Sequence, residues 1–277
     1  MDAKRQKIQL ELAFMAEGRG EAPMAADKGT EASKAKRKPE DPALAVLLME
    51  EICQRENLRR ALQRVRQNKG VPGIDGMTVK KLSGYLKKHW LQIREQLLAG
   101  TYSPEPVKGV EIPKPAGGIR KLGIPTALDR FIQQAIMQVL QKYWDKTFSE
   151  HSFGFRPGRS AHQAISRSQQ YVEQGYRWVV DIDLEKFFDR VNHDKLMGKL
   201  AKRIPDKRLL KIIRAFLNAG VMENGLVSAT TEGTPQGGPF TPQTILQTPL
   251  FRGLYKRGWG YPVNHSNSLL AYLNFPD

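Results

Sequence analysis

Apolar side chains recur every three to four residues through much of the chain, and this is the spacing of one face of a helix. Glycines at positions 70 and 100 follow the first two periodic stretches and are typical of helix C-termini. The pattern predicts helices over residues 42–70, 78–100, 126–148, 161–174, 193–203 and 205–220.

Three segments between these helices have the character of strands. Residues 101–125 are rich in proline and glycine and predict extended strands around a PAGG turn. RWVVDIDL, residues 177–184, has the β-branched content and alternation of a strand. VMENGLVSATT, residues 221–231, predicts a hairpin because Asn-Gly supplies the positive φ angles of a two-residue turn. Helices combined with short antiparallel strands predict an α+β fold.

The net charge of the chain is concentrated outside its first 40 residues. Residues 1–40 carry nine basic and seven acidic side chains and one aromatic residue, a composition that predicts a mostly disordered tail. Of the formal net charge of +16, this tail holds only +2. The remaining +14 on residues 41–277 indicates a polyanionic partner, chiefly nucleic acid.

Composition excludes several other classes of protein. The single cysteine, Cys53, rules out a disulfide framework, and the five histidines show no metal-ligand spacing. No run approaches 18 uninterrupted apolar residues, so we expect no membrane span. The N-terminus lacks the apolar core of a signal peptide, and we expect a cytoplasmic protein.

Two acids in the predicted strand 177–184 are the clearest candidates for chemistry. Side chains alternate along a strand, so Asp181 and Asp183 share one face. Two neighbouring carboxylates on an apolar strand require a cation or hydrogen-bond donors, and Mg²⁺ binds one or two carboxylates while keeping sites for water and phosphate. The alternative is a strand end with both acids in solvent.

Two further segments could bind phosphates or bases. In GTPQGGP, residues 233–239, Gly237 removes side-chain bulk and Gln236 adds an amide that can pair with a base or a phosphate. In IPKPAGGIRKLGIP, Lys114 and Arg120 would flank a hairpin tip and suit a triphosphate. An ordinary turn and a solvated basic hairpin are the respective alternatives.

The helix predicted over residues 42–70 has a basic outer face. Arg59, Arg60 and Arg64 lie on it, opposite the apolar positions. A solvated helix face explains such a pattern, and so does a surface that binds RNA phosphates.

Taken in order, five segments resemble the successive sequence blocks of group II intron reverse transcriptases, which are also called intron-encoded maturases. The segments are GVPGIDGMT, LLAGTYSPEPVKGVEIPKPAGGIRKLGIPTALDRFIQQAI, FSEHSFGFRPGRSAHQAI, WVVDIDLEKFFDRVNHDKL and GTPQGGP. The resemblance spans residues 44–240. It implies a right-hand polymerase, with helix-rich fingers and N-terminal extension helices over residues 41–170 and a partial palm with a short antiparallel sheet over residues 171–240.

The same resemblance implies nucleotidyl transfer with two Mg²⁺ ions, and dNTP, an RNA template, a DNA primer and group II intron RNA as partners. It matches Asp183 to the metal-binding aspartate of the first palm motif, with the Leu184 carbonyl as a further ligand, and gives Asp181 no fixed catalytic role. Phe188 matches the aromatic residue that excludes a ribose 2′-hydroxyl. The other matches are Lys114 and Arg120 on the triphosphate, Gln236 and Gly237 in the nucleotide pocket, and Arg156 and Arg159 against the template.

Past Phe240 the sequence departs from the family pattern, as a truncation or a frameshift would make it do. The Tyr-x-Asp-Asp hairpin that completes the metal site is missing, and the 277 residues contain no Asp-Asp pair. We therefore expect a poorly ordered or improvised tail over residues 241–277 and no useful polymerisation by this chain alone. The run SLLAYLNF in this tail is apolar enough to favour aggregation.

Two functions besides a reverse transcriptase lineage stay open from the sequence. One is a non-catalytic RNA-binding module of maturase type, which the basic helix and the charge of +14 favour. The other takes DID, residues 181–183, as the metal motif of a nucleotide-sugar glycosyltransferase, but it leaves SFGFRPGRS, GTPQGGP and the positive charge unexplained.

Overall fold

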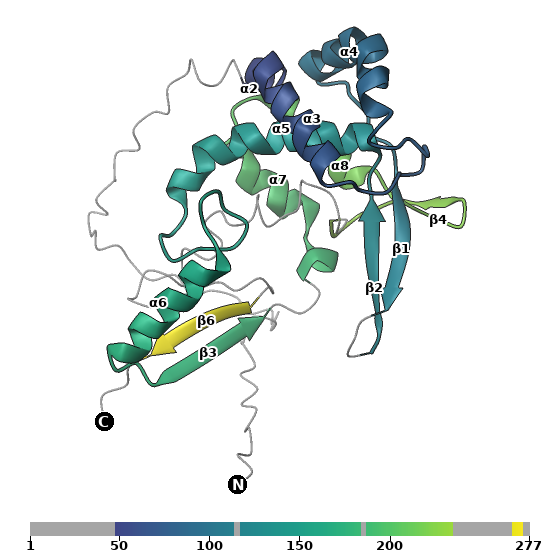
Figure 1. Cartoon of the computed structure of the whole chain (residues 1–277). Helices are drawn as coiled ribbons and strands as arrows, with labels where there is room; N and C mark the ends of the chain where they lie inside the picture. Colours follow the sequence, from purple (N-terminus) through teal and green to yellow (C-terminus); the bar gives the residue numbers. More distant parts are fainter. Residues whose placement is uncertain (1–47, 114–116, 184–186, 235–267, 274–277) are drawn as a thin grey trace, which may run out of the picture. The chain divides into compact units, whose positions relative to one another are not determined.

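The computed structural model describes residues 48–113, 117–183, 187–234 and 268–273, all within one compact unit of the chain (Figure 1). Its helices and strands follow one another in a mixed order that confirms the predicted α+β class. The helices are α2 (Leu48–Ile52), α3 (Arg55–Gln67), α4 (Leu82–Ala99), α5 (Ala127–Trp144), α6 (Ala161–Glu173), α7 (His193–Ala201) and α8 (Lys207–Asn218), with short 3-10 turns η1 (Asp145–Thr147) and η2 (Phe187–Arg190). The strands are β1 (Val107–Pro113), β2 (Ile119–Ile124), β3 (Trp178–Asp183), β4 (Val221–Glu223), β5 (Leu226–Ser228) and β6 (Ser268–Leu273).

The first predicted helix is interrupted, so that α2 and α3 are separate. Gln54 has an extended backbone (ψ 139°) between them. The amide of buried Asn57 donates to the carbonyls of Ile52 (2.9 Å) and Ala135 (3.1 Å), which satisfies a carbonyl left open at the break and fastens it to α5. Gly70 does not end α3, which stops at Gln67.

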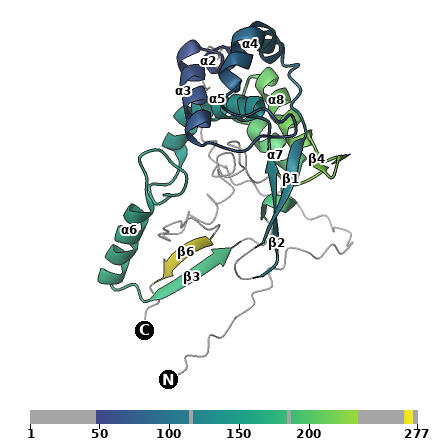
Figure 2. The same ribbon diagram turned by 45° about the vertical axis from the view of Figure 1, so that its right-hand side comes forward.

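Helix α5 is the centre of the apolar core. Figures 1 and 2 both show α3 lying along it, and the two helices make the most extensive helix–helix contact among the described elements. The predicted apolar face is confirmed, because Phe131, Ile132, Ile136, Val139 and Leu140 are all buried. Thr126 caps the first turn by accepting a hydrogen bond from the Asp129 amide (3.1 Å).

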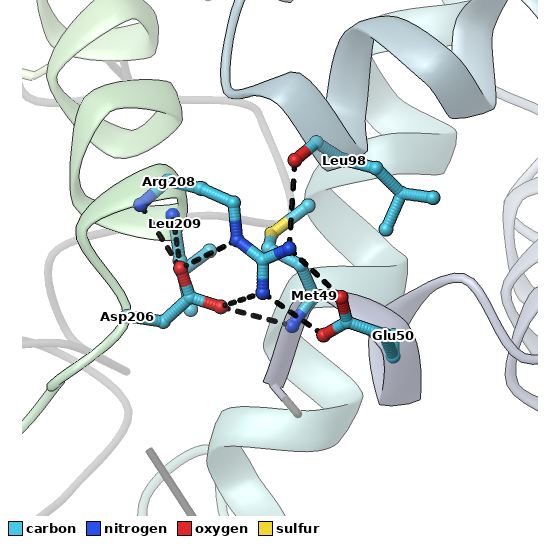
Figure 3. Close-up of polar contacts among 6 residues, drawn as sticks. All are labelled: Met49, Glu50, Leu98, Asp206, Arg208 and Leu209. Carbon is cyan, nitrogen blue, oxygen red and sulfur yellow. Dashed lines mark hydrogen bonds and ion pairs between the residues drawn. The ribbon is translucent and has the colours of Figure 1, made fainter. Parts of the chain in front are cut away.

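An ion-pair network joins the start of α8 to α2 (Figure 3). Asp206 caps α8 and accepts hydrogen bonds from the backbone amides of Arg208 (2.9 Å) and Met49 (3.3 Å). The Arg208 guanidinium lies between the carboxylates of Asp206 (2.9 Å) and Glu50 (2.8 Å). Helices far apart in sequence are therefore fixed together by one shared cation.

Two sheets carry the strands. In the first, of order β2-β1-β4-β5, β1 pairs with β2 antiparallel and with β4 in parallel at Val107–Val221. The predicted Asn-Gly turn of β4–β5 is confirmed, since Asn224 and Gly225 have φ angles of 52° and 82°. In the second sheet, β3 pairs with β6 antiparallel.

Strand β6 lies inside the segment that we interpreted as a divergent tail. Its residues, SLLAYL, form part of the run that we expected to favour aggregation, and here they cover one edge of β3. The interpretation of the rest of residues 241–277 concerns positions outside the described residues and stays a prediction.

Candidate functional site

Asp183 is the last residue of β3 and pairs with Ser268, the first residue of β6. Asp181 pairs with Leu270, and the alternation of the strand puts both aspartates at positions on the same face. The facing strand, Ser268–Leu273, contains no acidic residue. Of the two described strands of this sheet, only β3 therefore carries carboxylates. Leu184 lies outside the described residues.

The beginning of GTPQGGP is hydrogen-bonded to the segment that follows β3 and η2. The Gly233 amide donates to the Val191 carbonyl (2.8 Å), and Nε2 of buried His193 donates to the Gly233 carbonyl (2.6 Å). A β-bridge between Asn192 and Glu232 continues this contact. The end of the WVVDIDLEKFFDRVNHDKL block and the start of GTPQGGP, about 40 residues apart in sequence, are thus in contact. Gln236 and Gly237 themselves lie outside the described residues.

His193 is a residue that sequence reasoning missed as part of the site. Its partner is a backbone carbonyl 40 positions away, and no local pattern marks such a contact. The histidine also begins helix α7, which the Asn192 side chain caps by accepting a hydrogen bond from the Lys195 amide (2.9 Å). His193 therefore fixes the approach to GTPQGGP relative to the first turn of a helix.

The hairpin β1–β2 carries one of the two predicted triphosphate cations, Arg120. Arg120 pairs with Ile112 next to the turn, and Lys114 lies outside the described residues. The neighbouring Lys121 contacts Glu223 of β4 (3.2 Å), and this hydrogen bond and charge raise the pKa of Lys121. The contact ties the hairpin to the β4–β5 hairpin, which leads into GTPQGGP.

The first block, GVPGIDGMT, packs on the start of α5. A Cβ on Gly73 would lie 2.7 Å from the Cα atom of Thr126, and a Cβ on Gly70 would lie 2.0 Å from a guanidinium nitrogen of Arg130. Arg130 donates to the Val71 carbonyl (2.8 Å). Gly73 thus allows a close approach of two backbones, and Gly70 leaves room for the Arg130 guanidinium.

Arg156, which we predicted against the template, is bound within its own loop. Its guanidinium donates to the Asp145 carboxylate (2.9 Å) and to the carbonyls of Ser149 (2.6 Å) and Ser152 (3.0 Å), and its side chain is only 6% exposed. Arg159, the other predicted template contact, is half-buried with its guanidinium over the Phe153 ring. This geometry gives Arg156 a part in shaping the loop that precedes α6.

The basic face of α3 is exposed as predicted. Arg60 and Arg64 lie in solvent, and Arg59 makes an exposed ion pair with Glu56 (3.1 Å) one turn away. Exposed pairs of this kind hold their partners weakly, so all three arginines can contact a polyanion.

Among the described residues, no three His, Cys, Asp or Glu side chains are grouped as metal ligands. The helices in the described part of the chain include none that is long and apolar enough to cross a membrane. The backbones of Asp183, Phe188 and Arg120 belong to described elements, and these residues lie at the end of β3, in η2 and in β2.

A sequence profile described as "Reverse transcriptase (RNA-dependent DNA polymerase)" matches residues 112–272, which is more than half of the chain. The chain belongs to the reverse transcriptase family. The match begins in the β1–β2 hairpin and ends within β6, so it extends past Phe240, beyond which we expected the sequence to depart from the family pattern.

Two curated relatives indicate the type of reverse transcriptase. Protein YkfC of Escherichia coli is 37% identical over 73% of this chain and 55% of its own length. The group II intron-encoded protein LtrA of Lactococcus lactis is 36% identical over 66% of this chain and 30% of its own length. The group II intron type is thereby confirmed. The chain spans about half the length of YkfC and about a third of the length of LtrA.

A solved structure agrees with the fold. A chain of the partial Cas6-RT-Cas1–Cas2 complex superposes with a TM-score of 0.51 at 21% identity, over 81% of this chain and 38% of that chain. The helices and small sheets of this chain therefore form a reverse transcriptase fold with fingers and palm.

Proposed function

We propose that this chain is a group II intron reverse transcriptase that binds intron RNA but does not synthesise DNA by itself. Its membership of the family supports nucleic acid as the partner. The excess of positive charge and the exposed arginines of α3 support binding through phosphates.

The pairing of β3 with β6 carries the second half of this proposal. Asp183 pairs with Ser268, and the residues of β6 are serine, leucine, alanine and tyrosine, so this strand has no carboxylate. After Asp206 the only acids in the 277 residues are Glu223, Glu232 and Asp277. The Glu223 carboxylate forms an ion pair with Lys121, and the backbone of Glu232 forms a β-bridge with Asn192.

Reverse transcriptases use divalent metal ions, and the residues of this chain fit a pair of such ions poorly. Two divalent cations about 4 Å apart repel each other strongly unless several carboxylates neutralise them. Asp183, with Asp181 beside it, leaves most of that charge uncompensated. We therefore assign no catalytic step to a metal in this chain.

Primer extension on an RNA template in Mg²⁺ tests the proposal. We expect no extension product from the purified chain above the level of Asp183→Ala. Extension by the parent chain that disappears in Asp183→Ala would contradict it and would establish an active polymerase.

One of the missing carboxylates can be replaced at the start of β6, where Ser268 pairs with Asp183 in register. We expect Ser268→Asp to bind Mn²⁺ more tightly than the parent in a spin-resonance titration, because the added acid would share the ion with Asp183. The same substitution in Asp183→Ala serves as the control, and equal affinity in both backgrounds would contradict the assignment of this edge.

Action as a non-catalytic RNA-binding module is the second candidate function. The exposed basic face of α3 favours it, because Arg60 and Arg64 are free of any ion pair in the described part of the chain. Affinity for group II intron RNA, compared with an unrelated RNA at several salt concentrations, tests this function. A shallow salt dependence with no preference for the intron would exclude it.

A further inference from the structure

Helices α7 and α8 form a hairpin with an unusual concentration of positive charge. Between His193 and Asn218 the sequence has eight Lys or Arg residues and two Asp residues. Asp206 is buried and bound by Arg208, and Asp194 pairs with Arg214 of the facing helix. Both acids of the hairpin are thus already taken.

The lysines of α7 lie along one exposed face of the helix. Lys195, Lys199 and Lys202 follow one another at intervals of four and three residues, so they are neighbours on the surface and span about 10 Å of helix. Leu196 and Leu200 on the other side are buried. Partial burial, together with the charges of Lys202 and Lys195, lowers the pKa of Lys199. The three ammonium groups therefore repel one another at close range.

Helix α8 adds two more exposed lysines. Lys207 and Lys211 lie on its polar side, one turn apart, while Leu209, Ile212 and Ile213 are fully buried. The ion pair between Arg214 and Asp194 joins the polar side of α8 to the first turn of α7. None of the five lysines takes part in an ion pair within the described part of the chain.

Helix stability alone does not account for this arrangement. A lysine near a helix C-terminus is favourable, and this explains Lys199 and Lys202 at the end of α7. Lys207 is the first residue of α8, where the positive end of the helix dipole makes a cation unfavourable. The Asp206 carboxylate caps this end of α8, but its charge is already paired with Arg208, so Lys207 gains no ion pair from it. A residue placed against a local rule is typical of a functional surface.

We infer that the lysine face of the α7–α8 hairpin, formed by Lys195, Lys199, Lys202, Lys207 and Lys211, is a docking surface for the phosphate backbone of RNA. It is a second contact surface besides the arginines of α3, and it rests on the proposed RNA binding. Lysines act on phosphates as point charges, so this face contributes affinity without reading sequence.

The surface favours RNA over an anionic membrane. A helix that lies on a membrane inserts large apolar side chains beside its lysines. Within residues 193–218 no large hydrophobic side chain is exposed, and the apolar side of α8 is packed in the core. Gly198, between Lys195 and Lys199, has nothing within 4 Å of the position that a Cβ would take, so the helix surface is open between the lysines.

The test replaces three lysines by glutamine in the full chain. Lys195→Gln/Lys199→Gln/Lys202→Gln removes three charges and keeps helix propensity, and Lys80→Gln/Lys87→Gln/Lys88→Gln removes three exposed charges in and before α4 as a matched control. A fluorescein-labelled RNA duplex is the probe, titrated at several salt concentrations. We expect the α7 variant to lose about 10-fold or more in affinity and about 2–3 in the slope of log K against log salt, and the α4 variant to lose much less.

Three outcomes would overturn the inference. Equal losses in the α7 and α4 variants would show that only total charge matters. Parent-like affinity of the α7 variant, while the parent binds RNA, would remove this surface and leave the proposed function intact. An absence of RNA binding by the parent would overturn both.

A second measurement does not depend on the folding of a variant. The parent chain is acetylated with an amine reagent, with and without the RNA duplex, and lysine modification is read by mass spectrometry. We expect RNA to protect Lys195, Lys199 and Lys202 several-fold more than Lys87 and Lys88. Protection by phosphatidylserine vesicles but not by RNA would overturn the assignment in favour of a membrane surface.

Discussion

Helices α5 and α8 each begin near a buried aspartate, and the two aspartates are held in opposite ways. Asp206 at the start of α8 shares the guanidinium of Arg208 with Glu50. Asp129 in the first turn of α5 has no such cation as a partner in the described part of the chain. It accepts from the Tyr102 hydroxyl (2.8 Å), the Thr126 hydroxyl (2.7 Å) and the Glu105 amide (3.3 Å).

This difference sets the direction of each pKa. Burial raises the pKa of Asp129 to about 6, because the hydrogen bonds from Thr126 and Tyr102 offset only part of the desolvation. Burial acts in the same direction on Asp206, but the hydrogen bonds and charge of Arg208 outweigh it and lower the pKa. Hydrogen-bond donors are enough to admit a buried carboxyl, but of these two aspartates only the one with a cation has its pKa lowered.

Removing the cation from the α8 aspartate gives the largest expected effect. Arg208→Met leaves Asp206 buried and Glu50 without a partner, so we expect the free energy of unfolding in urea to fall by about 3 kcal/mol at neutral pH. Adding Asp206→Asn to this variant should restore part of the loss, because the uncompensated charge is then gone. A loss smaller than that of Glu50→Gln alone would contradict the central place of Arg208.

Changing the pH acts on the α5 aspartate with the opposite sign. Its folded pKa of about 6 lies above the ordinary value of 3.8, so its contribution to stability is present below pH 4 and is lost as the pH rises through 6. We expect the free energy of unfolding of Asp129→Asn to rise by about 2 kcal/mol, relative to that of the parent, between pH 4 and pH 7. Urea unfolding at each pH measures the difference, and a parallel pH dependence of the two proteins would contradict it.

Removing one of the hydroxyl groups that donate to Asp129 is a smaller change. Tyr102→Phe keeps the packing of the ring against Phe216 and deletes the donor to the carboxylate. We expect a loss of about 1 kcal/mol at pH 7, where Asp129 is charged, and a smaller loss at pH 4. Tyr143→Phe, which deletes a half-buried hydroxyl bonded to Glu51 (2.6 Å), is the matched control and should cost less. An equal loss at both pH values would count against the link to Asp129.

Breaking the exposed ion pair of α3 should have no measurable effect on the free energy of unfolding. Arg59 and Glu56 form an ion pair of ordinary geometry, but their side chains are 73% and 62% exposed. We expect Arg59→Ala to leave the urea midpoint unchanged, because solvent screens such pairs. A shift comparable with that of Tyr102→Phe would show that the α3 surface is structurally important.

Most of the helices could be predicted because their signals are local. The apolar face of α5, the glycine that ends α4 and the Asn-Gly turn of β4–β5 each depend on a few neighbouring residues. The break between α2 and α3 could not be predicted, because it is stabilised by a hydrogen bond from Asn57 to Ala135, 78 positions away. Strand β6 is likewise an apolar run whose partner strand cannot be read from its own residues.

The candidate site was predictable as a set of blocks but not as a set of contacts. The strand ending at Asp183 has a clear pattern of alternation. The link from His193 to Gly233 depends on distant backbone atoms and has no such pattern. Arg156 shows the same problem for charges, since the hydrogen bonds of its guanidinium within its own loop have no local sequence pattern, and its predicted template contact stays a prediction.

The distance in sequence between β3 and β6 has a consequence for synthesis of the protein. Asp183 and its partner Ser268 are 85 residues apart in sequence, whereas the helices of the core all precede β6 in the chain. During translation, β3 must wait with one edge uncovered until β6 has left the ribosome. A nascent chain stalled in that interval would present a free, apolar strand edge, and such an edge is a natural substrate for a chaperone.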